Sequence, residues 1–181
     1  MKYLKTYKIF ENLESKINLN ELEDILIDFK QMGLEDDKID IKLGSSTILD
    51  FNKLNSDKVY KISSGFLDRY TKGKTNNSLT IEFNTPEKQE YNISEVSEAY
   101  EMLKSYLYDN YDLIPNYIYI NFHWDYLYFE NFEKLKEYKN DYPSGHNGII
   151  LGSKGDKYFK AHKLIFGFYE DPDAPFRGPE F

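Results

Sequence analysis

The sequence predicts an α+β protein, a two-layer sandwich in which amphipathic helices cover one face of a mainly antiparallel sheet. Residues 19 to 33 and 93 to 111 repeat apolar side chains at the helical period of 3.6 residues. Alternating apolar runs at 39 to 43 and 118 to 124 follow them, as in strands with one buried face. Stacking a helix layer on a sheet layer buries both patterns, and a ferredoxin-like topology is one possible form.

Capping signals mark the ends of the two predicted helices. Asn18 precedes the first helix with Glu21 three residues on, which is a capping-box pattern, and Gly33 can close that helix in the left-handed conformation. Asn92 and Glu95 repeat the arrangement at the start of the second helix. These signals define the helix boundaries independently of the apolar periodicity.

Weaker patterns indicate the remaining elements. Further strands are predicted at 58 to 63 and at 78 to 84, and apolar spacing from Phe129 to Tyr138 predicts a shorter third helix. A hairpin is predicted from 149 to 168. Residues 170 to 181 hold three of the six prolines together with acidic side chains, which predicts an extended tail.

Length and composition favour a single domain over residues 1 to 169. The 17 Tyr and 13 Phe predict a largely aromatic core, and the absence of cysteine excludes disulfides, thiolate nucleophiles and zinc fingers. The net charge of -8, with arginine only at Arg69 and Arg177, weighs against nucleic acid as a partner. Phosphate recognition needs clustered cations.

The chain lacks the features of a membrane protein or an exported one. No run approaches the roughly 20 apolar residues that span a bilayer. Lys2, Lys5 and Lys8 interrupt the apolar residues at the N-terminus, so no signal-peptide core is present. We therefore expect a cytoplasmic protein without a membrane contact.

Three residues are the named candidates for catalytic chemistry, and pairs among the 31 acidic residues are a further possibility. A cleft that brought His123 or His146 together with Asp125 would suit a small hydrolase or a nucleotide-handling enzyme. The histidine spacing matches neither a helical pair nor a zinc signature, so we expect no metal site. Phosphate-loop and dinucleotide fingerprints are missing as well, and we expect no cofactor.

One short segment has a resemblance to an enzyme family. Residues 144 to 148, Ser-Gly-His-Asn-Gly, resemble the glycine-histidine-asparagine-glycine segment of bacterial peptidyl-tRNA hydrolases. The similarity covers these five residues only. The glycine-rich opening strand of that family, with its own histidine and asparagine, has no counterpart at this N-terminus, and a tight turn at Gly145 and Gly148 explains the segment as well.

A surface rich in tyrosine is the main candidate for binding. If the apolar residues of 118 to 124 face the core, alternation places Tyr117, Tyr119 and His123 on the opposite face. Exposed tyrosines form hot spots in protein interfaces and also stack on bases. The acidic charge favours a protein partner over RNA. The alternative is that the third helix or the tail covers this face.

The N-terminus is similar to that of a group of viral proteins. Residues 1 to 5, Met-Lys-Tyr-Leu-Lys, lead to Phe10 and Glu11, as at the starts of many uncharacterised small proteins of tailed bacteriophages. Residues 6 to 9 separate the two halves of the pattern. The resemblance implies a phage origin without any particular chemistry. We therefore expect a phage-type accessory or virion-associated protein, in the host cytoplasm or the virion, that binds a host protein, a virion protein or itself.

Overall fold

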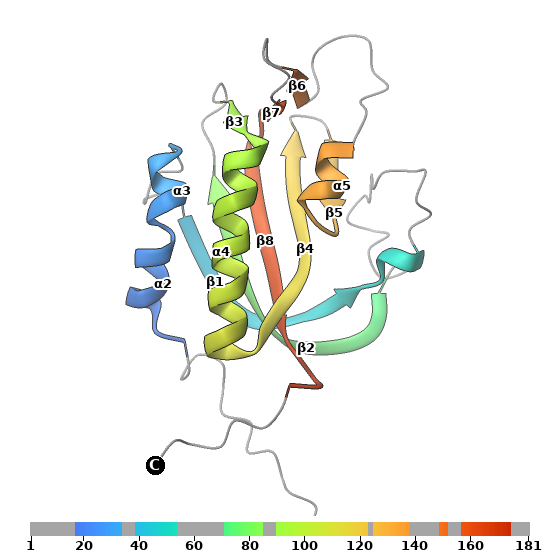
Figure 1. The fold of residues 1–181 in the computed structure, drawn as a ribbon. Helices are drawn as coiled ribbons and strands as arrows, with labels where there is room; N and C mark the ends of the chain where they lie inside the picture. The colour runs from blue at the N-terminus through green and yellow to red at the C-terminus, as the bar shows by residue number, and fades with distance from the viewer. Residues whose placement is uncertain are drawn as a thin grey trace, which may run out of the picture.

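The protein is an α+β two-layer structure, as predicted, with its helices on one face of a five-stranded antiparallel sheet (Figure 1). The computed structural model describes residues 17–33, 39–53, 71–84, 90–122, 125–137, 149–151 and 157–174. The predicted strand at 58 to 63 and the loop at 144 to 148 lie outside these residues. So do the first sixteen residues, which carry the viral resemblance.

Two of the three predicted helices agree closely with the structure. α4 (Ile93–Tyr111) has the predicted bounds, and α5 (Phe132–Glu137) is the short third helix, although Phe129 belongs to the strand before it. The segment predicted as one helix over residues 19 to 33 is divided into α2 (Leu19–Ile25) and α3 (Ile27–Gln31) by a turn at Leu26.

The predicted caps are present, with one difference. The side-chain oxygens of Asn18 and Asn92 each accept a hydrogen bond from the N–H two residues on, at 3.2 and 2.9 Å. Glu21 does not return to the backbone of Asn18 but accepts from its side-chain amide at 2.8 Å. At the C-terminal ends, Gly33 has φ 91° and Asp112, which closes α4, has φ 54°.

The strands form a large sheet and a small one. The elements are β1 (Ile39–Leu49), β2 (Thr71–Asn84), β3 (Tyr91–Asn92), β4 (Leu113–Phe122), β5 (Asp125–Phe129), β6 (Ile149–Leu151), β7 (Lys157–Phe159) and β8 (Lys163–Glu170). The large sheet has the order β1-β2-β8-β4-β5, and β3-β7-β6 form the small one. The order of the described elements along the chain, which begins with α2, α3, β1 and β2, is not the β-α-β-β-α-β order of a ferredoxin-like fold.

The predicted hairpin from 149 to 168 is shorter than expected. β6 and β7 pair with each other in the small sheet, whereas β8 leaves them and lies between β2 and β4 at the centre of the large sheet. The last strand of the described chain therefore joins segments that are distant in sequence.

The outer half of the β1–β2 hairpin forms an arm that leaves the sheet. β2 pairs with β8 only over residues 78 to 84, and the arm curves away behind the lower ends of β8 and β4 (Figure 1). Asn116 fastens it to β4, beside an irregularity in the strand pairing. The amide oxygen of Asn116 accepts from Leu49 N–H at 2.9 Å, and its NH₂ donates to Thr47 O at 3.2 Å. Asn116 is 5% exposed, so both bonds satisfy a buried amide.

The core is aromatic, as predicted, and Phe166 on β8 is its centre. Its ring centroid lies 4.7 Å from that of Tyr100 on α4, 5.4 Å from that of Phe83 on β2 and 5.6 Å from that of Phe29 on α3. Phe132 on α5 completes the group at 6.1 Å. One ring on the central strand thus contacts rings from three helices and a neighbouring strand.

Hydrogen bonds tie the start of α2 to the end of α4. The Tyr106 hydroxyl donates to Glu21 Oε2 at 3.0 Å, and the Tyr111 hydroxyl accepts from Asn18 N–H at 3.3 Å. The two tyrosine hydroxyls are 3.2 Å apart. This network holds α2, and with it α3, alongside α4.

Truncation of Phe166 tests its central position. We expect Phe166→Ala to lower the free energy of unfolding by about 3 to 5 kcal/mol, because it leaves a cavity among four facing rings. Phe166→Leu should cost less, since it keeps most of the apolar volume. Urea unfolding followed by circular dichroism measures both, and equal losses for the two variants would contradict this role.

Removal of the Tyr100 hydroxyl should be neutral or stabilising. The hydroxyl is buried without a hydrogen-bond partner among the described residues, so Tyr100→Phe removes a polar group that folding leaves unsatisfied. Burial raises the pKa of Tyr100 above its usual 10.0. Just above pH 10, the unfolded chain loses this proton while the folded protein keeps it. The free energy of unfolding therefore falls as the pH rises, and this decrease should be smaller in Tyr100→Phe.

Tyr106→Phe is the matched control, because the Tyr106 hydroxyl donates to Glu21. We expect it to cost about 0.5 to 1.5 kcal/mol at neutral pH. Thermal unfolding between pH 7 and pH 11 compares the two variants. A loss of stability in Tyr100→Phe equal to that in Tyr106→Phe would show that the Tyr100 hydroxyl has a partner.

Candidate binding site on the open face of the sheet

The structure confirms that Tyr117 and Tyr119 lie on the sheet face opposite the helices. Ile118 and Ile120, which alternate with them on β4, are fully buried in the core beneath α4. Tyr117 and Tyr119 are half-buried. They are neither sealed in the interior nor extended freely into solvent.

A third tyrosine, Tyr128, completes the cluster from the edge strand β5. It pairs directly with Tyr119, and their ring centroids are 4.9 Å apart in an edge-to-face arrangement. The Tyr117 ring meets Tyr128 in the same way at 5.4 Å. Sequence reasoning missed Tyr128, although alternation along residues 125 to 129 contained the signal. We call these three half-buried residues the tyrosine face.

Gly167 allows the Tyr117 ring to lie close to the backbone of β8. The two residues are directly paired, and a Cβ at position 167 would come within 2.6 Å of Tyr117 Cε1. Any larger residue here would displace the ring. The central strand therefore has a large aromatic, Phe166, on its core face and the smallest residue on its open face.

Charged side chains from three strands lie on the same face as the tyrosines. Glu82 on β2 accepts hydrogen bonds from Lys163 on β8 and from Lys42 on β1, the latter at 3.2 Å. Lys42 also pairs with Asp40 at 2.9 Å. The Glu82 side chain is only 11% exposed, so the two lysines compensate a largely buried carboxylate.

The protonation states on this face favour hydrogen bonding over proton transfer. Burial raises the pKa of Tyr117, and a hydrogen bond with Thr80 partly opposes that rise. Burial also raises the pKa of Tyr128, with a further contribution from the neighbouring tyrosines. Burial alone would raise the pKa of Glu82, but the hydrogen bonds from Lys163 and Lys42 lower it. At neutral pH these tyrosines therefore keep their protons and Glu82 is ionised.

The alternative that the third helix covers the tyrosines is wrong. α5 packs on the other side of the sheet, where Phe132 meets Tyr100 with ring centroids 5.2 Å apart. α2, α3 and α4 also lie on that side (Figure 1). Of the predicted tail, Asp171 donates its N–H to Asp112 O at 2.8 Å, and residues 175 to 181 lie outside the described residues. The helices α2, α3, α4 and α5 therefore leave the tyrosine face uncovered.

The candidate catalytic residues lie largely outside the part of the chain that the structure describes. Asp125 begins β5, paired with Phe122, but its side chain is not described, and His123 and His146 lie outside the described residues. The third histidine, His162, is half-buried and donates its backbone N–H to Asn121 O at 2.8 Å. The described residues contain no group of three acidic or histidine side chains placed to hold a metal. The hydrolase alternative stays a hypothesis.

Comparison of the chain with protein-family models, curated proteins and solved structures finds no match in any of the three. None of the described helices has the length and apolar character needed to cross a membrane.

Replacement of Glu82 should destabilise the protein in a pH-dependent way. We expect Glu82→Gln to cost about 1 to 3 kcal/mol at pH 7, because two lysines lose a charged partner. The pKa of Glu82 is lower in the folded protein than its usual value of 4.5 in the unfolded chain. Ionised Glu82 therefore stabilises the fold fully above pH 4.5, and this contribution is lost as the pH falls through the pKa of the folded state. The difference between variant and wild type should therefore shrink at acid pH.

Urea unfolding at pH 7 and at about pH 3 measures this difference. Glu133→Gln is the matched control, because Glu133 pairs with Lys136 at the surface and its side chain is 73% exposed. Its replacement should change stability by less than about 1 kcal/mol. A loss for Glu82→Gln that is the same at both pH values would contradict the assignment.

Proposed function

We propose that this protein is a binding protein without catalytic activity, and that the tyrosine face holds a segment of another protein. The observation that most supports this proposal is the cluster of three half-buried tyrosines on the sheet face opposite α2, α3, α4 and α5. Such a surface presents ring edges for apolar contact and hydroxyls for hydrogen bonds at the same place. Tyrosines with both properties dominate the energy of many protein interfaces.

The tyrosine face is organised before any partner arrives. Tyr128 contacts both other rings edge to face, and Gly167 lets Tyr117 lie against β8. A ring already fixed by its neighbours loses little conformational freedom on binding, so more of its contact energy contributes to affinity. Protonated hydroxyls on Tyr117 and Tyr128 suit a partner that offers carbonyl or carboxylate acceptors.

The charges on this face favour a protein segment over nucleic acid. Lys42 and Lys163 are cations that the described strands place on the same sheet face as the tyrosines, and both bond Glu82. Neither lysine is therefore available to neutralise a phosphate without disturbing a buried carboxylate. With a net charge of -8, the chain as a whole repels a polyanion.

The proposal includes a biological role in a bacteriophage. The similarity of residues 1 to 11 to the starts of tailed-bacteriophage proteins supports a phage-type accessory or virion-associated role. The partner would then be a host protein, a virion protein or a second copy of this chain.

Truncation of the tyrosines tests the proposal. With the purified chain as bait in a host or virion lysate, we expect Tyr119→Ala and Tyr128→Ala to reduce retention of the specific partner at least about tenfold, which is typical of an interface hot spot. Tyr119→Phe, which keeps the ring, should retain more than Tyr119→Ala. Quantitative mass spectrometry of the retained proteins, with light scattering for self-association, measures these outcomes.

Tyr108→Ala is the matched control, because Tyr108 on α4 is a tyrosine 42% exposed on the helix side of the molecule. It should leave retention unchanged. Equal retention by the Tyr119→Ala, Tyr128→Ala and wild-type chains would overturn the proposal. Salt-sensitive binding of single-stranded nucleic acid that is lost in Tyr119→Ala would replace it with the RNA-type alternative.

A further inference from the structure

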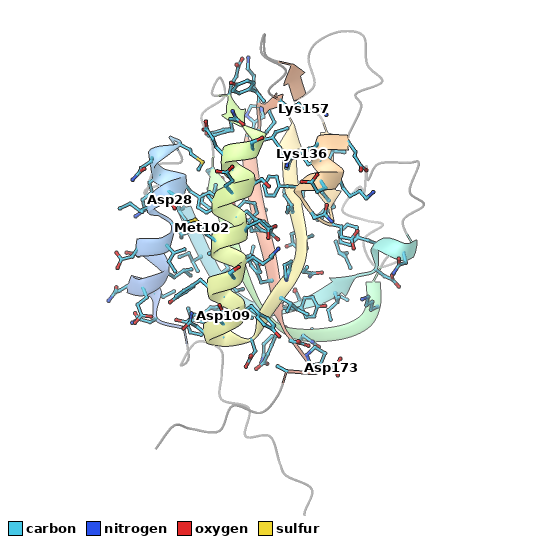
Figure 2. All side chains as sticks on the ribbon, viewed as in Figure 1. Asp28, Met102, Asp109, Lys136, Lys157 and Asp173 are labelled. Atoms are coloured by element: carbon cyan, nitrogen blue, oxygen red, sulfur yellow. The ribbon has the colours of Figure 1, made fainter. Side chains whose placement is uncertain are left out.

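A second surface, independent of the tyrosine face, lies between two helices. α3 and α4 enclose an open groove of about 370 Å³ lined by Asp28, Gln31, Met32, Glu95, Glu98, Ala99 and Met102. Figure 2 shows Asp28 on α3 and Met102 on the neighbouring α4. The lining residues of each helix recur at spacings of three and four positions, so they share one helix face. In both helices the acidic residues come before the methionine in the sequence. We call this the methionine groove.

The floor of the methionine groove is apolar and adaptable. Met102 is 57% exposed, the largest exposed fraction among the described large hydrophobic residues, and Met32 is half-buried beside it. Ala99 also lines the groove, and its small side chain leaves room above it. Methionine is flexible and polarisable, so a pair of methionines accommodates apolar side chains of several shapes.

The rim of the groove is acidic. Asp28, Glu95 and Glu98 carry three carboxylates, and among the residues that the structure describes no lysine or arginine lines the groove. Within the described part of the chain, none of the three belongs to an ion pair. By contrast, Glu101 on the next turn pairs with Lys104.

We propose that the methionine groove docks a basic amphipathic helix from a partner protein. A helix in a groove places apolar residues at i, i+3, i+4 and i+7 on the floor and leaves its flanks at the rim. Lysines on those flanks meet Asp28, Glu95 and Glu98, while leucines contact Met32 and Met102. The charge pattern selects against a second copy of this chain, which carries a net charge of -8.

A synthetic helical peptide of about four turns, built of leucine and lysine with leucine on one face, is the probe. The full-length protein should bind it, as measured by calorimetry. Met102→Ser and the triple variant Asp28→Asn/Glu95→Gln/Glu98→Gln should each weaken binding at least about tenfold. Added salt should weaken binding to the wild type but have little effect on the triple variant.

Two controls separate the groove from general attraction to an acidic protein. Glu130→Gln/Glu133→Gln/Glu137→Gln removes the same charge near α5, and Tyr108→Ser removes an exposed apolar residue of α4 outside the groove. Both should bind the peptide as the wild type does. Circular dichroism and thermal unfolding verify that every variant is folded.

Four results would overturn the proposal. The first is no measurable binding of the peptide to the wild type. The second is equal weakening by the two triple variants, which would indicate non-specific charge attraction. The third is a dimer that dissociates in Met102→Ser, which would make a second copy the occupant. Loss of peptide binding in Tyr119→Ala would transfer the site to the tyrosine face.

Discussion

The packing of Phe166 against rings from α3, α4, α5 and β2 is the interaction on which the rest of the structure depends. β8 is the central strand of the large sheet. The Phe166 ring on it is the point where α3, α4 and α5 meet the sheet. A core with so many rings and little alanine gains its stability from a few large contacts. The position of α3 relative to α4, and with it the methionine groove, follows from how their rings meet Phe166.

The same alternation that buries Phe166 creates the opposite surface. Gly167 follows it on β8, and the absence of a side chain there lets Tyr117 approach the strand. On β4, Ile118 and Ile120 belong to the core while the flanking tyrosines face away. The tyrosine face and the aromatic core thus lie on opposite faces of the same sheet, so the geometry of one restrains the other.

Local signals in the sequence account for most of the elements but not for their pairing. Asn92 predicts the start of α4 closely, and the alternation from Ile118 predicts β4 but not its start at Leu113, because caps and periodicity act within a few residues. The central place of β8 depends on contacts with β2 and β4 across long stretches of chain, which no local pattern records. Tyr128 is a different case, because the alternation along residues 125 to 129 indicates its face and only its neighbour Tyr119 comes from the strand pairing. Asn116, which fastens the hairpin arm, has no distinguishing sequence pattern.

The position of β8 has a consequence for biosynthesis. Because the last strand of the described chain lies between β2 and β4, these two strands have no partner on that side while a ribosome is still making residues 163 to 170. The nascent chain therefore carries two unpaired strand edges and an incomplete core until translation passes this point. Folding of the large sheet must be essentially a late event, and chaperone protection matters most just before it.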